Sequence, residues 1–340
     1  MNKSLLFISM FFLFSLAGCV KEQAQQEDQP VKVSVNLASV QTKTYLGETV
    51  DGKRQVYWSA GDAINVNGYV SLPLTQEQSG KATADFQLYN GTLPYSVIYP
   101  ASICGEFASD GTVTVNVPSS QEYSPSSFGK GSAILYGYSE SADAPVTLHN
   151  LCAAVKVSLN SNVGTSIAKA SIISNSSSSP VAGKFTINPQ SGEYTVADGI
   201  TSISLDIEEV SLEGDGEQSF YFTVPYGVYP EGFTIKFYDS ENFPMECLWR
   251  SNGEAGVTLE AGKLYEFKPV DFVPGKKEIL TGEDWVYIAT CINKSDNSWK
   301  SVYLDENTNT IKLGADITLP EGTPQITKDF TYVLDGQGYT

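Results

Sequence analysis

The stretch Val31-Lys32-Val33-Ser34-Val35-Asn36-Leu37 alternates apolar and polar side chains, and this pattern decides the fold class. A period of two places one set of side chains on a buried face and the other in water, which is typical of a β-strand. The same alternation returns along the chain at 113–117, 155–159, 203–207, 220–224 and 233–237. Turn pairs such as Asp51-Gly52 separate the strands, and no window has a convincing helical period. The chain is therefore predicted to be all-β, with β-sandwiches built mostly of antiparallel sheets.

The chain of 340 residues is longer than one ordinary domain, and its strand pattern breaks at two places. Small, polar residues occupy 139–144, and a second break lies at Val273-Pro274-Gly275-Lys276-Lys277. We therefore expect three parts in tandem, which are an N-terminal β-sandwich at 31–143, a second β-sandwich at 144–272 and a short β-rich C-terminal module at 273–340.

The N-terminus has the features of an export signal. Lys3 precedes an apolar run from Leu5 to Leu16, which is too short to span a bilayer because a spanning helix needs about 20 residues. The run closes on Leu16-Ala17-Gly18-Cys19, which resembles the lipobox of bacterial lipoproteins. This resemblance implies a signal peptide at 1–18, acyl chains such as palmitate on Cys19, and a lipidated tether at 19–30. The alternative is a buried N-terminal helix that ends in a core cysteine.

Charge and cysteine content narrow the range of partners. The 39 Asp and Glu residues outnumber the 21 Lys and Arg residues, which disfavours binding to nucleic acid or to an anionic membrane surface. Four further cysteines stand at Cys104, Cys152, Cys247 and Cys291 without any CxxC pair, so a zinc site is not expected. Export would permit disulfides, but we favour free, buried thiols.

Four local motifs follow one another along the chain. They are Trp58-Ser59-Ala60-Gly61-Asp62-Ala63-Ile64-Asn65-Val66, Tyr99-Pro100-Ala101-Ser102, Val117-Pro118-Ser119-Ser120-Gln121-Glu122-Tyr123 and Leu148-His149-Asn150-Leu151-Cys152-Ala153-Ala154-Val155-Lys156. In residues and in order, these motifs resemble those of the fimbrillin family. The resemblance covers about residues 31–272. Strand ends and tight turns account for every residue in these motifs, so we interpret them as residues that maintain the fold.

The resemblance implies two transthyretin-like β-sandwich domains and a place in, or beside, the surface pili of Gram-negative anaerobes. It further implies a lipoprotein precursor at the outer membrane, cut by a trypsin-like protease after the first strand. A strand of another subunit then replaces the removed strand, which is an instance of β-strand addition. The segment Val20-Lys21-Glu22-Gln23 loosely resembles signals for the outer face of the outer membrane.

On this interpretation the removable strand is Val31–Leu37. The predicted processing site follows Arg54, with Lys53 and Lys43 as alternatives, because the turn-rich segment 47–55 is open to a protease. The competing interpretation of Arg54 is an ordinary solvated charge in a turn.

The sequence offers no enzyme chemistry and no cofactor motif. His149 stands alone, so no Ser-His-Asp or Cys-His arrangement can be built. Asp305, Asn307 and Asn309 have the spacing of a calcium loop, but the central glycine is replaced by Thr310, and we expect a hairpin loop there instead of a metal site. Local groups of acids such as 206–209 and 213–217 are expected to be solvated rather than paired for glycoside hydrolysis.

The tail differs from the fimbrillin pattern. Residues 302–304 and 311–313 are predicted to form a hairpin, and 313–319 followed by 334–340 resembles the opening turns of a parallel β-helix. This extension favours a tip, an anchor or a stand-alone adhesin over a shaft subunit. Two alternatives are a glycan-binding surface lipoprotein that does not polymerise and, less favoured, a polysaccharide lyase built on the tail.

Overall fold

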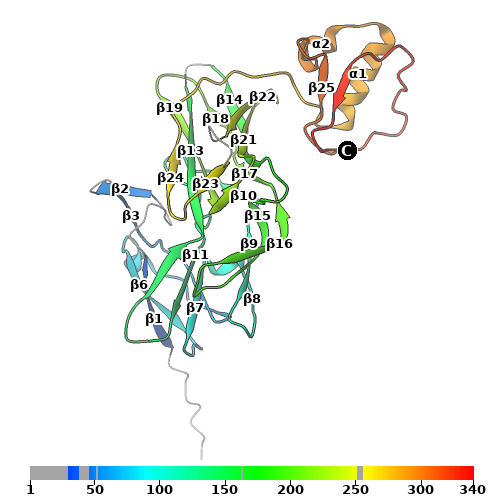
Figure 1. Ribbon diagram of the computed structural model, residues 1–340. Helices are drawn as coiled ribbons and strands as arrows, with labels where there is room; N and C mark the ends of the chain where they lie inside the picture. The colour runs from blue at the N-terminus through cyan, green and yellow to red at the C-terminus, as the bar shows by residue number, and fades with distance from the viewer. Residues whose placement is uncertain (1–29, 38–45, 51–52, 162–163, 251–255) are drawn as a thin grey trace, which may run out of the picture.

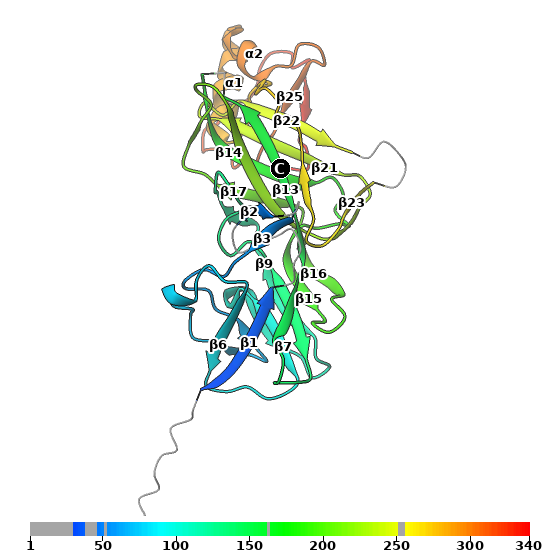
Figure 2. The same ribbon diagram turned by 90° about the vertical axis from the view of Figure 1, so that its left-hand side faces the viewer.

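The computed structural model describes residues 30–37, 46–50, 53–161, 164–250 and 256–340 (Figure 1). Strands make up 43% of the chain and helices 9%, which confirms the all-β class. Two β-structures follow one another along the long axis of the molecule, and the C-terminal module stands beside the second of them (Figures 1 and 2). Among the described residues, no helix has the length and apolar character needed to cross a membrane.

The first β-structure is a sheet of seven strands around one core. Its strands, in spatial order, are β5 (Tyr69–Val70), β4 (Asn65–Val66), β7 (Tyr95–Tyr99), β11 (Leu135–Ser139), β12 (Val146–Asn150), β1 (Val31–Leu37) and β6 (Thr83–Leu88). Strand β12 follows the expected boundary at 143/144, yet Val146 and Leu148 pack in the core of this first sheet. The boundary itself stays a prediction.

The second β-structure has two sheets that share one core. The first sheet contains β10 (Ser120–Glu122), β17 (Ser202–Asp206), β14 (Ser166–Ser174), β21 (Phe233–Asp239) and β22 (Pro244–Trp249), with β18 (Val210–Ser211) paired to β14. The second sheet contains β19 (Glu217–Pro225), β13 (Cys152–Asn160) and β24 (Leu264–Glu266), and a further ladder joins β20 (Gly227–Tyr229) to β23 (Val257–Leu259). Val155 of β13 and Ile172 of β14 belong to the same buried core, which lies between the two sheets.

A further sheet ties the two halves of the chain together. It contains β16 (Tyr194–Ile200), β15 (Ala182–Ile187), β9 (Val113–Val117) and β8 (Cys104–Phe107). Strands β8 and β9 precede residue 143, whereas β15 and β16 follow it. The alternating valines of β9 are buried with the core of the second β-structure. The two halves are therefore joined by hydrogen bonds between strands as well as by the chain itself.

The C-terminal module corrects one expectation. It was expected to be β-rich, but it contains α1 (Gly282–Lys294) and α2 (Ser298–Tyr303), with only the short strands β25 (Thr310–Lys312) and β26 (Val333–Asp335). The spacing i, i+3, i+4, i+7, which is typical of a helix, is followed by Trp285, Ile288, Ala289 and Ile292. Ile288 and Ile292 lie in the core of the module, Trp285 packs against that core, and Ala289 is buried in α1. A capping box between Thr281 and Asp284 starts the helix.

The strand predicted at 302–304 is also wrong, whereas the strand predicted at 311–313 largely matches β25. Val302 and Tyr303 are the last two residues of helix α2. Tyr303 lies with Trp299 in the small core of the module, and Val302 packs against that core. Two parallel pairings occur in this module, and the resemblance to a parallel β-helix stays a prediction. Strand β25 pairs in parallel with β26, and Ile279 forms a parallel bridge with Leu313.

Candidate strand-exchange site

Strand β1, the predicted removable strand, lies between two neighbours. Val35 is paired in parallel with Val146 of β12, and Val33 is paired in antiparallel fashion with Phe86 of β6. Because β6 follows β1 in the sheet order, removal of β1 would leave a groove between β12 and β6. Such a groove exposes two rows of backbone groups that can form hydrogen bonds with a strand.

The side chains of β1 fill this groove on the core side. Val33, Val35 and Leu37 are 2%, 0% and 6% exposed, respectively. They belong to the same core cluster as Phe86 of β6 and Leu148 of β12. The alternation in the sequence therefore explains why these three side chains are buried, since every second side chain of a strand points to the same face.

The outward side of β1 is held by polar contacts to β6. Lys32 Nζ lies 2.6 Å from Asp85 Oδ2, and the hydroxyl of Ser34 donates to Asp85 Oδ1 at 2.5 Å. The pKa of the Asp85 carboxyl is lowered first by the hydrogen bond from Lys32 and then by that from Ser34. These contacts are exposed to solvent, so they fix the register of β1 more than they stabilise it.

The predicted processing residues lie in the next hairpin. Strand β2 (Leu46–Val50) pairs with β3 (Lys53–Val56), and Arg54 is opposite Thr49. Arg54 and Lys53 are therefore in a paired strand rather than in an open turn as the sequence suggested. Figure 1 shows this hairpin standing off the side of the molecule. Cys19 and the alternative Lys43 lie outside the described residues.

Two of the sequence motifs, at 58–66 and 99–102, contact each other in the core of the first β-structure. Tyr99, at the end of β7, donates from its hydroxyl to Asp62 Oδ1 at 3.0 Å, and the amide of Ser59 donates to Asp62 Oδ2 at 2.7 Å. The indole ring of Trp58 packs edge-on against Phe86 and Tyr99, with ring centroids 5.1 and 5.3 Å away. Burial raises the pKa of the Asp62 carboxyl despite its hydrogen bonds. The residues of these two motifs therefore belong to the same core as the buried side chains of β1.

A third motif joins the strands of the second β-structure. Gln121 donates from Nε2 to the carbonyl of Thr223 at 2.8 Å and accepts from the amide of Thr223 at 3.0 Å. The fourth motif runs from β12 into β13, where burial raises the pKa of the Cys152 thiol to about 12. The four cysteines of the described chain are free thiols, of which Cys152 and Cys291 are buried.

The polar residues considered for catalysis or metal binding, at His149, 305–309, 206–209 and 213–217, do not form a common site in the described part of the chain. His149 is exposed on β12 with its ring 5.9 Å from that of Tyr136. Asp305 forms an antiparallel bridge with Thr310, so the calcium-like run is the hairpin loop that was expected. Within the described ranges, no group of three or more His, Cys, Asp or Glu side chains is placed to hold a metal ion. The acids at 208–209 and 213–217 are exposed, which confirms their solvated position.

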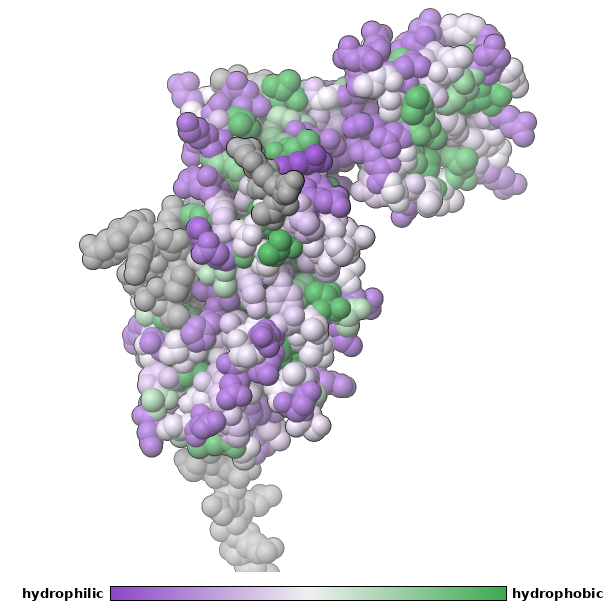
Figure 3. All heavy atoms as spheres, viewed as in Figure 1, coloured by the Kyte–Doolittle hydropathy of each residue, from purple (hydrophilic) through white to green (hydrophobic). Residues whose placement is uncertain are grey.

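One buried charged cluster involves none of the residues singled out in the sequence. Lys236 Nζ lies 2.5 Å from Glu278 Oε1 in a buried ion pair between β21 and the start of the C-terminal module. The two residues are 42 positions apart, and nothing local in either segment marks them as partners. Elsewhere, the face of the molecule in Figure 3 is mostly hydrophilic, with apolar residues in separate small groups.

No family model and no curated protein matches this chain. Solved structures similar to it include a putative cell adhesion protein from Bacteroides ovatus, with 12% sequence identity and a TM-score of 0.44 over 72% of this chain and 92% of that one. A putative cell adhesion protein from Bacteroides uniformis has 18% identity and a TM-score of 0.38 over 72% and 95% of the two chains. The tip fimbrial protein Mfa3 from Porphyromonas gingivalis has 8% identity and a TM-score of 0.30 over 73% and 96%.

Proposed function

We propose that this chain is a fimbrillin-type cell-surface lipoprotein, a fimbrial subunit or adhesin, in which strand β1 is a temporary occupant of a strand-exchange groove. The observation that carries the proposal is the place of β1, which lies between β12 and β6 with three buried side chains and is followed by a hairpin that contains Arg54. The sequence motifs support the family, and lipid on Cys19 would hold the protein on the outer membrane.

The burial of β1 explains why an exchange needs a replacement strand. Each fully buried Val or Leu side chain contributes about 1.5–3 kcal/mol, so the side chains of Val33, Val35 and Leu37 hold β1 firmly. If β1 left without a replacement, the core side chains that Val33, Val35 and Leu37 cover would be exposed to water. A donor strand must therefore bring apolar side chains at the same alternate positions, and its backbone must complete both ladders.

A cut after Arg54 would change how β1 is held. In the intact chain β1 is covalently joined to the rest of the domain through the β2–β3 hairpin. After the cut, β1 would be held by its two ladders, its core contacts and the pairing of Leu46 with Val56 across the cut. Because Arg54 is paired with Thr49, the hairpin has to open locally before a protease can act.

The proposed organisation is a signal peptide at 1–18, a tether at 19–30, two β-sandwiches over 31–272 that share strands across residue 143, and a module at 273–340. A module of this size after the second sandwich favours a tip, an anchor or a stand-alone adhesin. The solved structures named above are putative cell adhesion proteins and a tip fimbrial protein, but the proposal rests on the motifs and on the position of β1 between β12 and β6.

The test of strand exchange compares the full chain with its Lys53→Ala/Arg54→Ala double variant on the cell surface. N-terminal sequencing of surface-shaved protein is expected to give a start at Gln55 for the unchanged chain and none there for the variant. If the chain is a polymerising subunit, unheated gels should show a ladder only for the unchanged chain. Lys184→Ala, which removes an exposed lysine on β15, is the matched control. A start near Gln55 in the double variant, or identical ladders, would refute the processing site.

The test of the anchor is metabolic labelling with a fatty-acid analogue. The unchanged chain is expected to take up the label and a Cys19→Ala variant to lose it. An unlabelled native chain would remove the proposed membrane attachment, whatever the result at Arg54.

A further inference from the structure

The groove that β1 fills has an outward side that faces solvent, in addition to its buried core side. The outward residues of its two neighbouring strands are Thr83, Asp85 and Gln87 on β6 and Thr147 and His149 on β12. Asp85 is the only carboxylate among these five residues, and it stays on β6 if β1 leaves. A strand that replaces β1 therefore has to place its own outward side chains beside this carboxylate.

In the intact chain, β1 supplies two partners for the Asp85 carboxylate. Lys32 Nζ lies 2.6 Å from one oxygen, and the hydroxyl of Ser34 donates to the other oxygen at 2.5 Å. Ser34 is paired with Asp85 in the ladder, and Lys32 lies two positions earlier on the same face of β1. The third outward residue, Asn36, accepts a hydrogen bond from Thr83 at 2.9 Å. All three outward side chains of β1 therefore contact β6.

The second sandwich contains a strand that resembles β1 in sequence and in position. Residues 155–160 of β13 are Val-Lys-Val-Ser-Leu-Asn, whereas residues 31–36 of β1 are Val-Lys-Val-Ser-Val-Asn. Each strand lies between one antiparallel and one parallel neighbour, which are β6 and β12 for β1, and β19 and β24 for β13. Lys156 of β13 also contacts carboxylates, since its Nζ lies 2.5 Å from Glu266 and 3.6 Å from Glu217. The same order of side chains thus occurs twice, each time beside a carboxylate of a neighbouring strand.

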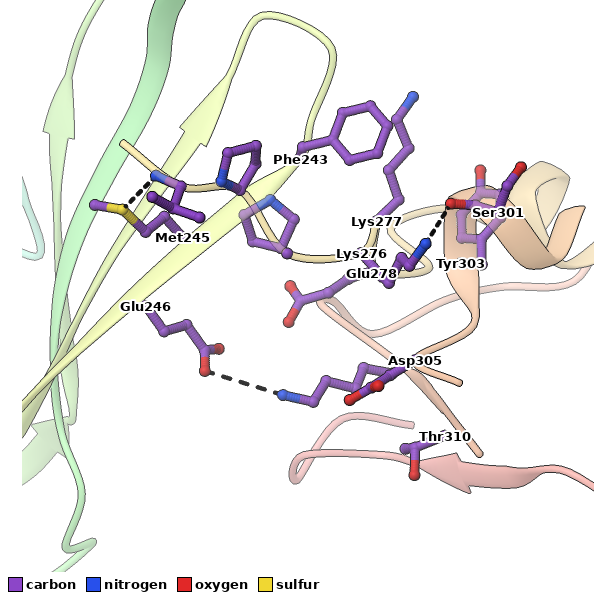
Figure 4. A pocket seen from close by; sticks show the side chains of 15 residues that line it. Phe243, Met245, Glu246, Lys276, Lys277, Glu278, Ser301, Tyr303, Asp305 and Thr310 are labelled. Atoms are coloured by element: carbon purple, nitrogen blue, oxygen red, sulfur yellow. Dashed lines mark hydrogen bonds and ion pairs between the residues drawn. The ribbon is translucent and has the colours of Figure 1, made fainter. Parts of the chain in front are cut away.

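The carboxylate of Asp85 differs from the charged groups of the cavity in Figure 4. This cavity of about 610 Å³ lies between the second sandwich and the C-terminal module. The ammonium of Lys277 lies 4.9 Å from the centre of the Phe243 ring, and Lys312 lies 3.9 Å from Glu246. These lysines have partners within the chain, whereas Asp85 loses both of its partners when β1 leaves.

The outward charge can discriminate between donor strands that fit the core side equally well. Any strand with apolar residues at alternate positions can cover the core side chains of the groove. Opposite charges on neighbouring strands favour pairing, and like charges disfavour it. The side chains of Lys32 and Asp85 are 62% and 46% exposed, so we expect a discrimination of about threefold to tenfold.

We propose that Asp85 is a specificity-determining residue of the groove, and that the groove accepts a strand of another subunit with the order apolar, basic, apolar, hydroxyl, apolar. The basic side chain of this donor strand forms an ion pair with Asp85, and its serine or threonine donates to the same carboxylate. A strand with an acidic residue at the basic position is disfavoured. The proposal rests on the strand-exchange function proposed above, and it adds the kind of strand that the groove selects.

The test follows the uptake of labelled peptides by the full chain after cleavage at Arg54. The chain has two arginines, Arg54 and the exposed Arg250, so an arginine-specific protease cuts an Arg250→Lys chain at Arg54 alone. Cleavage takes place in dilute urea, which opens the hairpin, and the urea is then diluted in the presence of excess peptide. The fragment that contains β1 stays in the mixture as a competitor. Gel filtration measures the label that remains on the chain.

Three peptides are compared, which have the sequence of 31–37, the same sequence with Lys32→Glu, and the sequence of 155–160. The Arg250→Lys chain is expected to take up the first and third peptides at least about three times more than the Lys32→Glu peptide. Adding Asp85→Asn should make the uptake of the first two peptides equal, and adding Asp85→Lys should reverse the preference. Glu106→Lys is the matched control, because it changes an exposed acid on β8 and shifts the net charge as Asp85→Lys does. It should keep the original preference.

The results separate the role of Asp85 from strand exchange itself. Equal uptake of the 31–37 peptide and its Lys32→Glu form, or a preference that survives Asp85→Asn, would overturn the role of Asp85 and leave strand exchange intact. Weaker uptake of the 155–160 peptide than of the Lys32→Glu peptide would overturn the proposed order of side chains. Uptake of none of the peptides would overturn strand exchange, and the role of Asp85 with it.

Discussion

The hydroxyl of Tyr99 donates a 3.0 Å hydrogen bond to the buried carboxylate of Asp62, and this bond joins two motifs that are 37 residues apart in the chain. Asp62 is 3% exposed and Tyr99 is 1% exposed. The same Tyr99 ring packs edge-on against Trp58 in the core that β1 completes. The bond therefore stabilises the core against which the side chains of β1 pack.

Tyr99→Phe is expected to lower the free energy of unfolding by about 1–3 kcal/mol, because it leaves one oxygen of a buried carboxylate without its donor. Urea unfolding of the full chain gives the value. Tyr89→Phe is the control, since Tyr89 is 61% exposed. Equal effects of the two changes would show that the bond contributes little.

The cost of Tyr99→Phe should depend on pH. Burial raises the pKa of Asp62 above 3.8, with opposing hydrogen bonds from Ser59 and Tyr99. Loss of the Tyr99 bond raises this pKa further in the folded state, while the unfolded pKa is unchanged. The folded variant then binds its proton more tightly, so the stability lost by the variant grows as pH rises from about 4 to about 7. A cost that is constant over this range would contradict the assignment.

Gln121→Ala is expected to destabilise the second sandwich by about 2–3 kcal/mol. The change removes both hydrogen bonds to the backbone of Thr223 and leaves a buried amide and a buried carbonyl without them. Glu122→Ala changes the neighbouring, exposed residue and should have an effect within about 0.5 kcal/mol. Thermal unfolding of the two variants side by side tests the difference.

Asp284→Ala is expected to destabilise the start of α1 by about 1–2 kcal/mol. Burial alone would raise the pKa of Asp284, but the hydrogen bonds from Tyr303, Thr281 and Leu280 together lower it. A lowered pKa in the folded state contributes stability that is complete above about 3.8 and is lost as pH falls through the folded pKa.

The measurement for Asp284→Ala is hydrogen exchange of the α1 amides, because it reports on this helix alone. Glu283→Ala is the control, since Glu283 is the exposed neighbouring acid in the first turn. Faster exchange in both variants to the same degree would assign the effect to charge near the helix start rather than to the capping box.

Lys236→Met is expected to lower stability by about 3–5 kcal/mol, because it leaves the charge of Glu278 buried without a partner. Adding Glu278→Gln should restore most of the loss, since the amide keeps a hydrogen-bond acceptor for Tyr238. Limited proteolysis of the linker 273–277 should follow the same order. If the single and double variants were cut equally fast, the ion pair would not be what holds the module.

Much of the strand framework could be predicted from the sequence. The alternation at 31–37 gives β1 with its inward side chains, because the side-chain period of a strand is fixed by its backbone. Helix α1 was missed although its apolar spacing and its Thr281–Asp284 box are both local signals. The pattern was obscured by Tyr287 and Cys291, which widen the apolar face beyond a clear stripe.

Side-chain periodicity over a few residues was enough to predict strands such as β1 and β9 and the buried face of each. Three relationships became visible only in the folded chain: β1 lies between β12 and β6, Arg54 is paired in a hairpin, and Lys236 forms an ion pair with Glu278. These relationships join residues far apart in the chain. They depend on how complete sheets pack and on the burial of paired charges, and no local pattern encodes such contacts.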